Sequence, residues 1–176
     1  MHGIVFTELQ KYVSTNFGPA TWFALPKEAG LESKVFLPTR PYPDEDIIAI
    51  VKAACQATGK TADQILEDFG YFIAPDLLKI FAASINPKWK TLDFLKNVES
   101  VIHKAVRINN PGATPPDLNV KRVSAVEIIY TSPRKMASLG LGIIKALAKH
   151  YNEENTIRIV MLPLADQQGT MFRISK

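Results

Sequence analysis

The sequence predicts an α+β domain in which helices pack on a small antiparallel sheet. Apolar residues follow helical spacing through most of the chain up to about residue 106. A rigid, proline-rich connector follows at 109–116, and runs of β-branched and aromatic residues beyond it indicate short strands. The resulting order of helices, a strand, a helix and further strands is typical of α+β folds.

The N-terminal part of the chain opens with two short helices. Residues 4–17 carry apolar side chains at helical spacing, and Gly18 and Pro19 end that pattern. We expect a second helix over 19–29. The segment 31–43 contains three prolines and is therefore expected to be a loop.

Two further helical segments follow that loop. Residues 44–58 repeat the apolar periodicity, and Thr61 and Gln64 have the spacing of a capping box that opens the next helix. We expect this next helix to run to about Gly70. The proline at position 75 then predicts a break or kink, because Pro75 cannot donate the backbone hydrogen bond that a helix interior requires.

The C-terminal part mixes helices with strands. We expect helices at 92–106 and 134–149, each with an apolar stripe. Segments with strand composition lie at 120–131, 157–162 and 171–174. The last two are joined through a turn at 166–169, so antiparallel pairing is the simplest arrangement for them.

Composition restricts the class of protein. The chain has 176 residues, 47% of them hydrophobic, which predicts one globular domain over residues 1–176.

The net charge is +4 and the basic residues are scattered, which argues against nucleic-acid binding. The single cysteine, Cys55, excludes an intrachain disulfide and a CxxC zinc site. No signal-peptide pattern and no apolar run near ~18 residues is present. These features predict a cytoplasmic protein with no membrane association.

His103 and a group of three polar residues downstream form the strongest candidate site. Tyr130, Ser132 and Arg134 occupy alternate positions, which share one face of an extended strand. Two hydroxyls and a guanidinium on one face can bind a carboxylate, and a single imidazole can ligate a metal. One histidine and an anion clamp are what a protein needs to hold haem, with its axial iron and two propionates.

Each part of this candidate site also has a simpler interpretation. At ~100° per residue His103 points about 130° from the centre of the apolar stripe on its helix, so a solvent-exposed histidine is the alternative. Strands often carry polar residues on a solvent face, and Pro133 requires a strand end or edge. Arg134 can equally lie at the start of the next helix. His2 is terminal and His150 lies at a helix end, which makes both weaker metal ligands.

Taken together, these residues resemble the H-NOX family of haem nitric-oxide/oxygen-binding domains, which are related to the sensor domain of soluble guanylate cyclase. The resemblance covers nearly the whole chain and rests on Met1-His2-Gly3, Gly18, Gly59-Lys60, Gly70, His103, Gly112–Pro116 and the Tyr-x-Ser-x-Arg signature. It implies a helical lobe over about 1–60, a second lobe of helices and sheet over about 61–176, and haem between them.

The resemblance implies a role for each residue of the candidate site. His103 would be the proximal ligand of the iron of haem b. Tyr130, Ser132 and Arg134 would bind the propionates, with Arg134 supplying charge-assisted hydrogen bonds. Pro116 would press on a pyrrole ring and hold the macrocycle out of plane, which alters haem electronics.

The resemblance also predicts which gas is bound. Ungapped alignment with the family places six residues around the sixth coordination position: Val5, Leu9, Ile73, Leu77, Leu139 and Ile143. Oxygen-binding members carry a tyrosine in place of Leu139, with further polar support nearby. A distal donor stabilises the partial negative charge on bound oxygen, whereas nitric oxide and carbon monoxide need it far less. We therefore expect binding of nitric oxide and carbon monoxide but not oxygen, unless Tyr71 or Tyr12 enters the pocket.

The output of such a sensor would pass to a separate protein, because the chain carries no cyclase or kinase domain. Within the family the usual bacterial partners are histidine kinases and cyclic-di-GMP enzymes, and the sequence does not choose between them. Two alternatives remain open, a carrier of haem or of another carboxylated macrocycle and an oxygen-binding member of the same family. A haem enzyme is disfavoured because the distal positions offer no acid or base.

Overall fold

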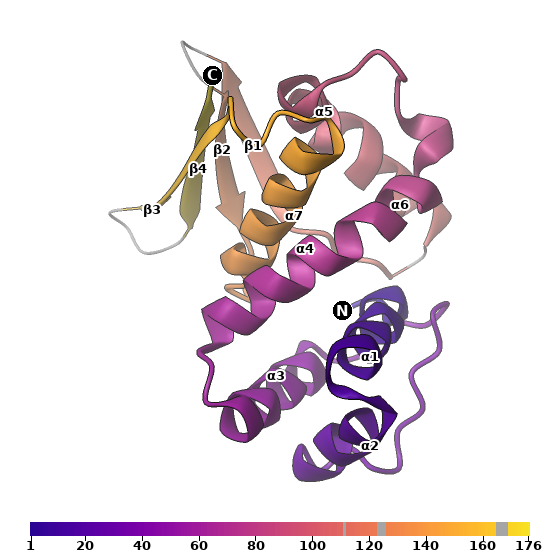
Figure 1. Cartoon of the computed structure of the whole chain (residues 1–176). Coiled ribbons are helices and arrows are strands. Elements are labelled where there is room, and N and C mark those ends of the chain that lie inside the picture. The colour runs from indigo at the N-terminus through magenta and orange to yellow at the C-terminus, as the bar shows by residue number, and fades with distance from the viewer. Residues whose placement is uncertain (111, 123–125, 165–168) are drawn as a thin grey trace.

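Two groups of elements joined by one long helix make up the protein (Figure 1). The computed structural model describes residues 1–110, 112–122, 126–164 and 169–176. The first group and the joining helix are α1 (Gly3–Phe17), α2 (Pro19–Glu28), α3 (Asp44–Thr58) and α4 (Ala62–Ile80). The first three confirm the helices expected from the apolar periodicity of the N-terminal part.

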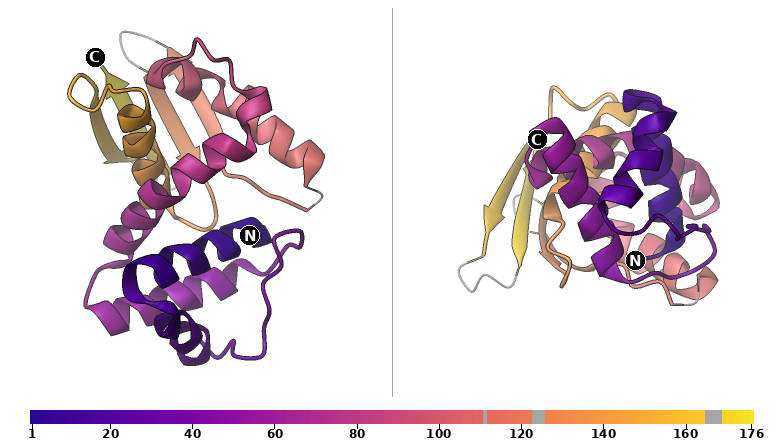
Figure 2. Two further views of the ribbon diagram at one scale, coloured as in Figure 1. Left: turned by 45° about the vertical axis from the view of Figure 1, so that its right-hand side comes forward. Right: turned by 90° about the horizontal axis from the view of Figure 1, so that it is seen from below.

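The second group combines short helices with a sheet. Its helical segments are η1 (Ala82–Ser84), α5 (Thr91–Asn97), the π-helical η2 (Val98–His103), α6 (Lys104–Asn109) and α7 (Ala137–His150). Its strands are β1 (Asp117–Arg122), β2 (Val126–Thr131), β3 (Arg158–Pro163) and β4 (Thr170–Ser175). α7 packs extensively against α4, and its opposite side faces the sheet (Figure 2).

The four described strands form one antiparallel sheet in the order β1-β2-β4-β3. The α+β class and the antiparallel pairing of the last two strands are therefore confirmed, while the turn expected at 166–169 lies almost wholly outside the described residues. The single strand expected at 120–131 is wrong. That run divides into β1 and β2, which pair with Val120 opposite Ile128. The run contains no glycine, proline, asparagine or aspartate, and Ser124 is its only residue of a type common in turns, so its composition is a weak signal of two strands.

α4 begins as expected and ends later than expected. The side chain of Thr61 accepts from the backbone N–H of Gln64 at 3.3 Å, and the backbone N–H of Thr61 donates to Oε1 of Gln64 at 2.9 Å, which confirms the capping box. The helix then continues through Pro75 to Ile80. The prediction of a break is wrong because the packing of α4 against α7 outweighs the one backbone hydrogen bond that Pro75 removes.

α4 and α7 cross with their backbones in direct contact. A Cβ atom added to Gly142 would lie 2.0 Å from the carbonyl oxygen of Glu67, and one added to Gly70 would lie 2.1 Å from that of Leu139. Both distances fall far inside van der Waals contact, and both obstacles are backbone atoms that cannot rotate away. Only glycine allows this crossing.

We expect Gly142→Ala to lower the free energy of unfolding by about 3 kcal/mol, because a helix pair must separate to admit the methyl group. Urea denaturation followed by far-UV circular dichroism measures this change. Gly140→Ala on the same helix is the matched control, since its Cβ would meet only the Phe172 ring, at 3.5 Å. The control should be neutral or slightly stabilising, and equal losses in the two variants would contradict the crossing argument.

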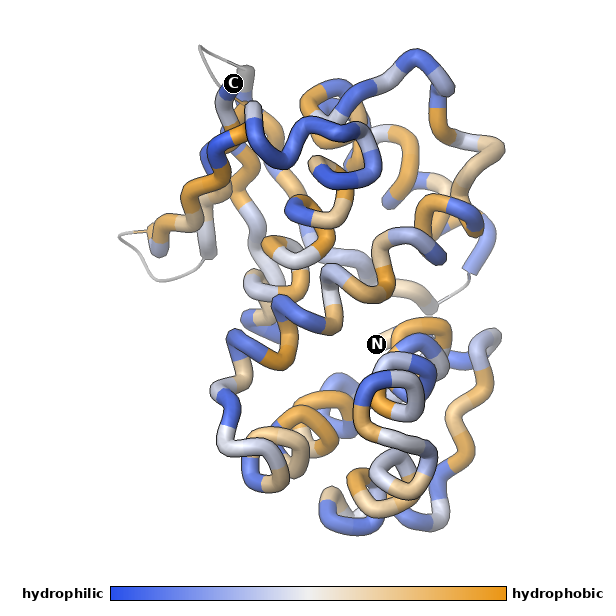
Figure 3. Tube along the Cα trace, in the orientation of Figure 1, coloured by the Kyte–Doolittle hydropathy of each residue, from blue (hydrophilic) through white to orange (hydrophobic). Residues whose placement is uncertain are grey.

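Buried apolar side chains form two clusters. One lies among α1 to α4 and includes Phe6 and Phe69, whereas the other lies between the sheet, α5 and α7 and includes Phe172. Ile143 of α7 contacts both clusters. Figure 3 shows apolar and polar residues alternating along the helices, as expected of elements with one buried side. Within the described ranges no helix is long and apolar enough to cross a membrane.

Candidate functional site

A cavity of about 300 Å³ lies where the two apolar clusters meet. Its walls come from the start of α1, the second half of α4, the segment from α5 to β1, the middle of β2 and α7. Most of the lining is aliphatic or aromatic, as is usual for pockets that enclose a small molecule. The polar side chains on the wall are His2, His103, Asn110, Thr114, Tyr130 and Arg134.

His103 reaches this wall through an irregularity in its helix. The segment expected as one α-helix over 92–106 is divided into α5, η2 and α6, and η2 is a π-helix that ends at His103. A π-turn contains more residues than an α-turn, so it rotates the following side chains away from their α-helical direction. The His103 side chain is 14% exposed and lines the cavity, so the solvent-exposed alternative is wrong.

The imidazole of His103 is held by a carboxylate. Its Nδ1 atom lies 2.8 Å from Oε2 of Glu99, one helical turn earlier. Because a carboxylate only accepts hydrogen bonds, this contact assigns the proton of the neutral ring to Nδ1. Burial lowers the pKa of His103 below its ordinary value, although Glu99 and the Pro116 carbonyl act in the opposite direction. The ring is therefore neutral near pH 7, the form that ligates a metal.

The three residues of the expected anion clamp lie close together but differ in their access to the cavity. Tyr130 belongs to the buried face of β2 and lines the cavity, with 7% of the residue exposed. Arg134 also lines it, from the turn between β2 and α7 rather than from a strand or a helix. Ser132 is not on the wall, and its Oγ accepts from the backbone N–H of Arg134 at 3.3 Å.

Arg134 already binds a carboxylate at the cavity edge. Its Nη1 atom lies 3.1 Å from Oδ2 of Asp44 and 3.2 Å from Oγ1 of Thr114, and its Nη2 donates to the Thr114 carbonyl. The amino group of Met1 lies 2.5 Å from Oδ1 of Asp44. These two cations outweigh burial and lower the pKa of Asp44. The contact with Asp44 shows that the Arg134 guanidinium can bind a carboxylate at this edge, and a propionate presents the same chemical group.

Five of the six residues expected around the sixth coordination position lie on the cavity wall. These are Val5, Ile73, Leu77, Leu139 and Ile143. Leu9 is 2% exposed and packs in the N-terminal core instead, because it faces the inner side of α1. Pro116 lies on the wall next to Pro115.

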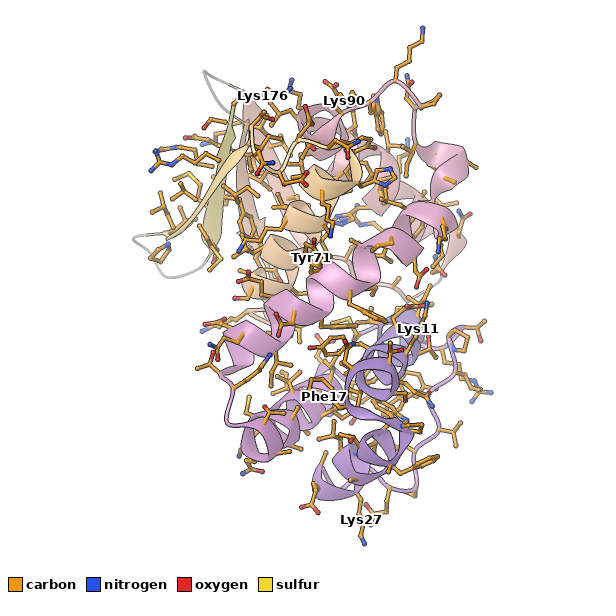
Figure 4. The ribbon with its side chains drawn as sticks, viewed as in Figure 1. Lys11, Phe17, Lys27, Tyr71, Lys90 and Lys176 are labelled. Atoms are coloured by element: carbon orange, nitrogen blue, oxygen red, sulfur yellow. The ribbon has the colours of Figure 1, made fainter. Side chains whose placement is uncertain are left out.

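Neither tyrosine left open by the sequence lines the cavity. Tyr12 is buried against Phe69 and Phe72. Tyr71 is 40% exposed on α4, where Figure 4 labels it, and its ring lies 5.7 Å from the Lys149 ammonium.

His2 is a cavity residue that sequence reasoning set aside. It is 9% exposed and lines the wall, because the N-terminus is fixed in place. The backbone N–H of Gly3 donates to the Arg40 carbonyl at 2.7 Å, and a Cβ at Gly3 would lie 1.9 Å from the Leu37 carbonyl. In the sequence, the feature that points to this placement is Gly3 directly after His2, because only glycine fits so close to the Leu37 carbonyl. Within the described ranges no three His, Cys, Asp or Glu side chains gather, so this part of the chain offers single ligands rather than a metal cage.

The fold and this cavity define an α+β ligand-binding domain whose apolar chamber presents a half-buried neutral imidazole and, at its edge, a guanidinium. This donor set fits a flat apolar cofactor that carries its own metal and two carboxylates.

The chain belongs to the Haem-NO-binding family, which matches residues 2–159. Members of this family, the H-NOX domains, bind haem and act as sensor domains. The resemblance stated from the sequence is thus confirmed.

Solved H-NOX structures share the whole fold. One from S. oneidensis in the Fe(II)NO ligation state has a TM-score of 0.90 and 20% identity, over 99% of this chain and 98% of that chain. The Fe(II) unliganded protein from K. algicida has a TM-score of 0.90 and 23% identity, over 100% of this chain and 96% of that chain. A mutant of the T. Tengcongensis protein has a TM-score of 0.83 and 25% identity, over 99% and 97% of the two chains.

Proposed function

We propose that this protein is a gas sensor that binds nitric oxide and carbon monoxide at a ferrous haem b ligated by His103, and that it excludes oxygen. The observation that carries the proposal is a half-buried, neutral imidazole on the wall of an apolar cavity in a chain of the Haem-NO-binding family. Bound haem would supply an iron with one coordination position open to a diatomic gas.

The cavity residues divide into three sets of roles toward bound haem. His103 would ligate the iron through Nε2, since Nδ1 is engaged by Glu99. At the cavity edge, Tyr130 and Arg134 would bind the propionates, and Ser132 holds the backbone of Arg134. Arg134 would then either bind Asp44 and a propionate together or exchange Asp44 for the propionate. Pro116 would supply a stiff apolar contact to the macrocycle.

The apolar character of Val5, Ile73, Leu77, Leu139 and Ile143 supports nitric oxide and carbon monoxide over oxygen. Bound oxygen accepts negative charge from ferrous iron and gains from a donor, and none of these five side chains can donate. His2 also lines the cavity and can donate a hydrogen bond, so a His2 ring close to the bound gas would favour oxygen binding. The family resemblance supports signalling to a separate cytoplasmic histidine kinase or cyclic-di-GMP enzyme, with this chain itself performing no catalysis.

The test is gas binding by the purified ferrous protein, followed by its Soret absorption. We expect the spectrum to change with nitric oxide and with carbon monoxide and to show no stable complex in air. A stable oxygen complex would overturn the exclusion of oxygen and would make His2 the first candidate for the hydrogen-bond donor. A protein that takes up no haem under any condition would overturn the whole proposal.

A further inference from the structure

The carboxylate of Glu99 has three partners from three parts of the second group of elements. Its Oε2 atom accepts from Nδ1 of His103 at 2.8 Å and from the backbone N–H of Leu118 at 3.3 Å. Its Oε1 atom lies 2.8 Å from Nη1 of Arg107. The partners belong to η2, to β1 and to α6, so the carboxylate cannot move without breaking contacts in more than one element.

The surroundings of Glu99 strengthen these contacts. Its side chain is 29% exposed, and its Oε1 atom faces the guanidinium of Arg107, which is always charged. A glutamate carboxyl paired with a guanidinium in this way carries its negative charge near neutral pH. A hydrogen bond to an ionised acceptor is about twice as strong as one between neutral groups.

We propose that Glu99 is a positioning residue that fixes the ring of His103 and increases the electron donation of its Nε2 atom to iron. This inference rests on the proposed haem ligation by His103. A carboxylate that accepts the Nδ1 proton gives the imidazole partial imidazolate character, as acidic partners do for metal-ligating histidines in general. A more basic imidazole stabilises ferric more than ferrous iron, so Glu99 lowers the reduction potential of the haem.

Arg107 acts in the opposite direction. By binding Oε1 it draws electron density away from the oxygen that faces His103. The backbone N–H of Leu118 keeps Oε2 in place independently of Arg107. Removal of the guanidinium should therefore leave the Glu99–His103 contact and make the carboxylate a stronger acceptor.

Two variants with opposite expected effects test the inference in the haem-loaded protein. Glu99→Gln keeps an acceptor oxygen but removes the charge, so the iron–histidine stretching band in resonance Raman spectra of the ferrous form should move to lower frequency. The equilibrium constant for reduction of the haem should rise about fivefold, which is the difference expected between a charged and a neutral acceptor. Arg107→Met should shift both readouts in the other direction. Glu154→Gln, in the exposed turn after α7, is the control for a lost surface charge.

The outcomes separate this inference from the proposed function. If the unaltered protein shows an iron–histidine band and neither variant moves it, or both move it in one direction, Glu99 has no electronic role. If Glu99→Gln does not retain haem, the Arg107→Met shift alone decides, and its absence overturns the inference. If the unaltered protein shows no iron–histidine band, the ligation by His103 fails instead.

Discussion

Replacement of His103 by glycine is expected to abolish haem ligation by the protein, and added imidazole is expected to restore it. The side chain is 14% exposed and forms part of the cavity wall, so its removal leaves a space that a free imidazole can fill. Haem absorbance per protein after purification, with and without imidazole, measures both effects. We expect most of the bound haem to be lost without imidazole, because the variant can form no bond from residue 103 to the iron.

Two controls make this result specific. His150→Gly removes a histidine from the end of α7, away from the cavity wall, and should leave haem content unchanged. His103→Gly also costs about 1 kcal/mol of helix stability, so far-UV circular dichroism of the variant checks that it is folded. Undiminished iron ligation in His103→Gly would assign the ligand elsewhere, and His2→Gly would then test the other histidine on the wall.

The sequence predicted the helices well because their apolar faces have a strong period. α1, α2 and α3 occur within one residue of the expected ranges, and Thr61 caps α4 as its spacing indicated. The failures share one physical cause, which is that local patterns cannot measure tertiary contacts. Packing against α7 keeps α4 helical through Pro75. β1 and β2 divide the run 120–131, which contains no glycine, proline or asparagine to mark the end of the first strand.

The sequence predicts which residues belong to the candidate site better than it predicts where their side chains point. A helical wheel assumes one angle per residue, and η2 departs from that angle in the turn that carries His103. The helical wheel does place Glu99 on the same flank as His103, because side chains four residues apart lie side by side on a helix, and the structure shows the two in contact. The terminal position of His2 predicts no role in a site, whereas the fit of Gly3 against the loop before α3 places His2 on the cavity wall.

Leu139→Tyr is expected to convert the protein into one that binds oxygen in air. Leu139 lies in the first turn of α7 and lines the cavity beside Ile143, with Ile73 of α4 also on the wall. A phenol at this position would bring an O–H donor into an otherwise aliphatic part of the chamber. A hydrogen bond to a charged acceptor contributes about 1.5–3 kcal/mol, which corresponds to an increase in oxygen affinity of about tenfold or more. Absorption spectra of the ferrous variant under air measure it.

Leu139→Phe separates the hydroxyl from the ring. Both variants add similar volume to the cavity, and both keep the backbone carbonyl of residue 139 against Gly70, where α4 and α7 touch. Only the tyrosine can donate a hydrogen bond. If oxygen binds to Leu139→Tyr and not to Leu139→Phe, the exclusion of oxygen in the unaltered chain follows from the missing donor. If the two variants behave alike, the aliphatic wall excludes oxygen through its shape, and the hydrogen-bond explanation for gas selectivity must be abandoned.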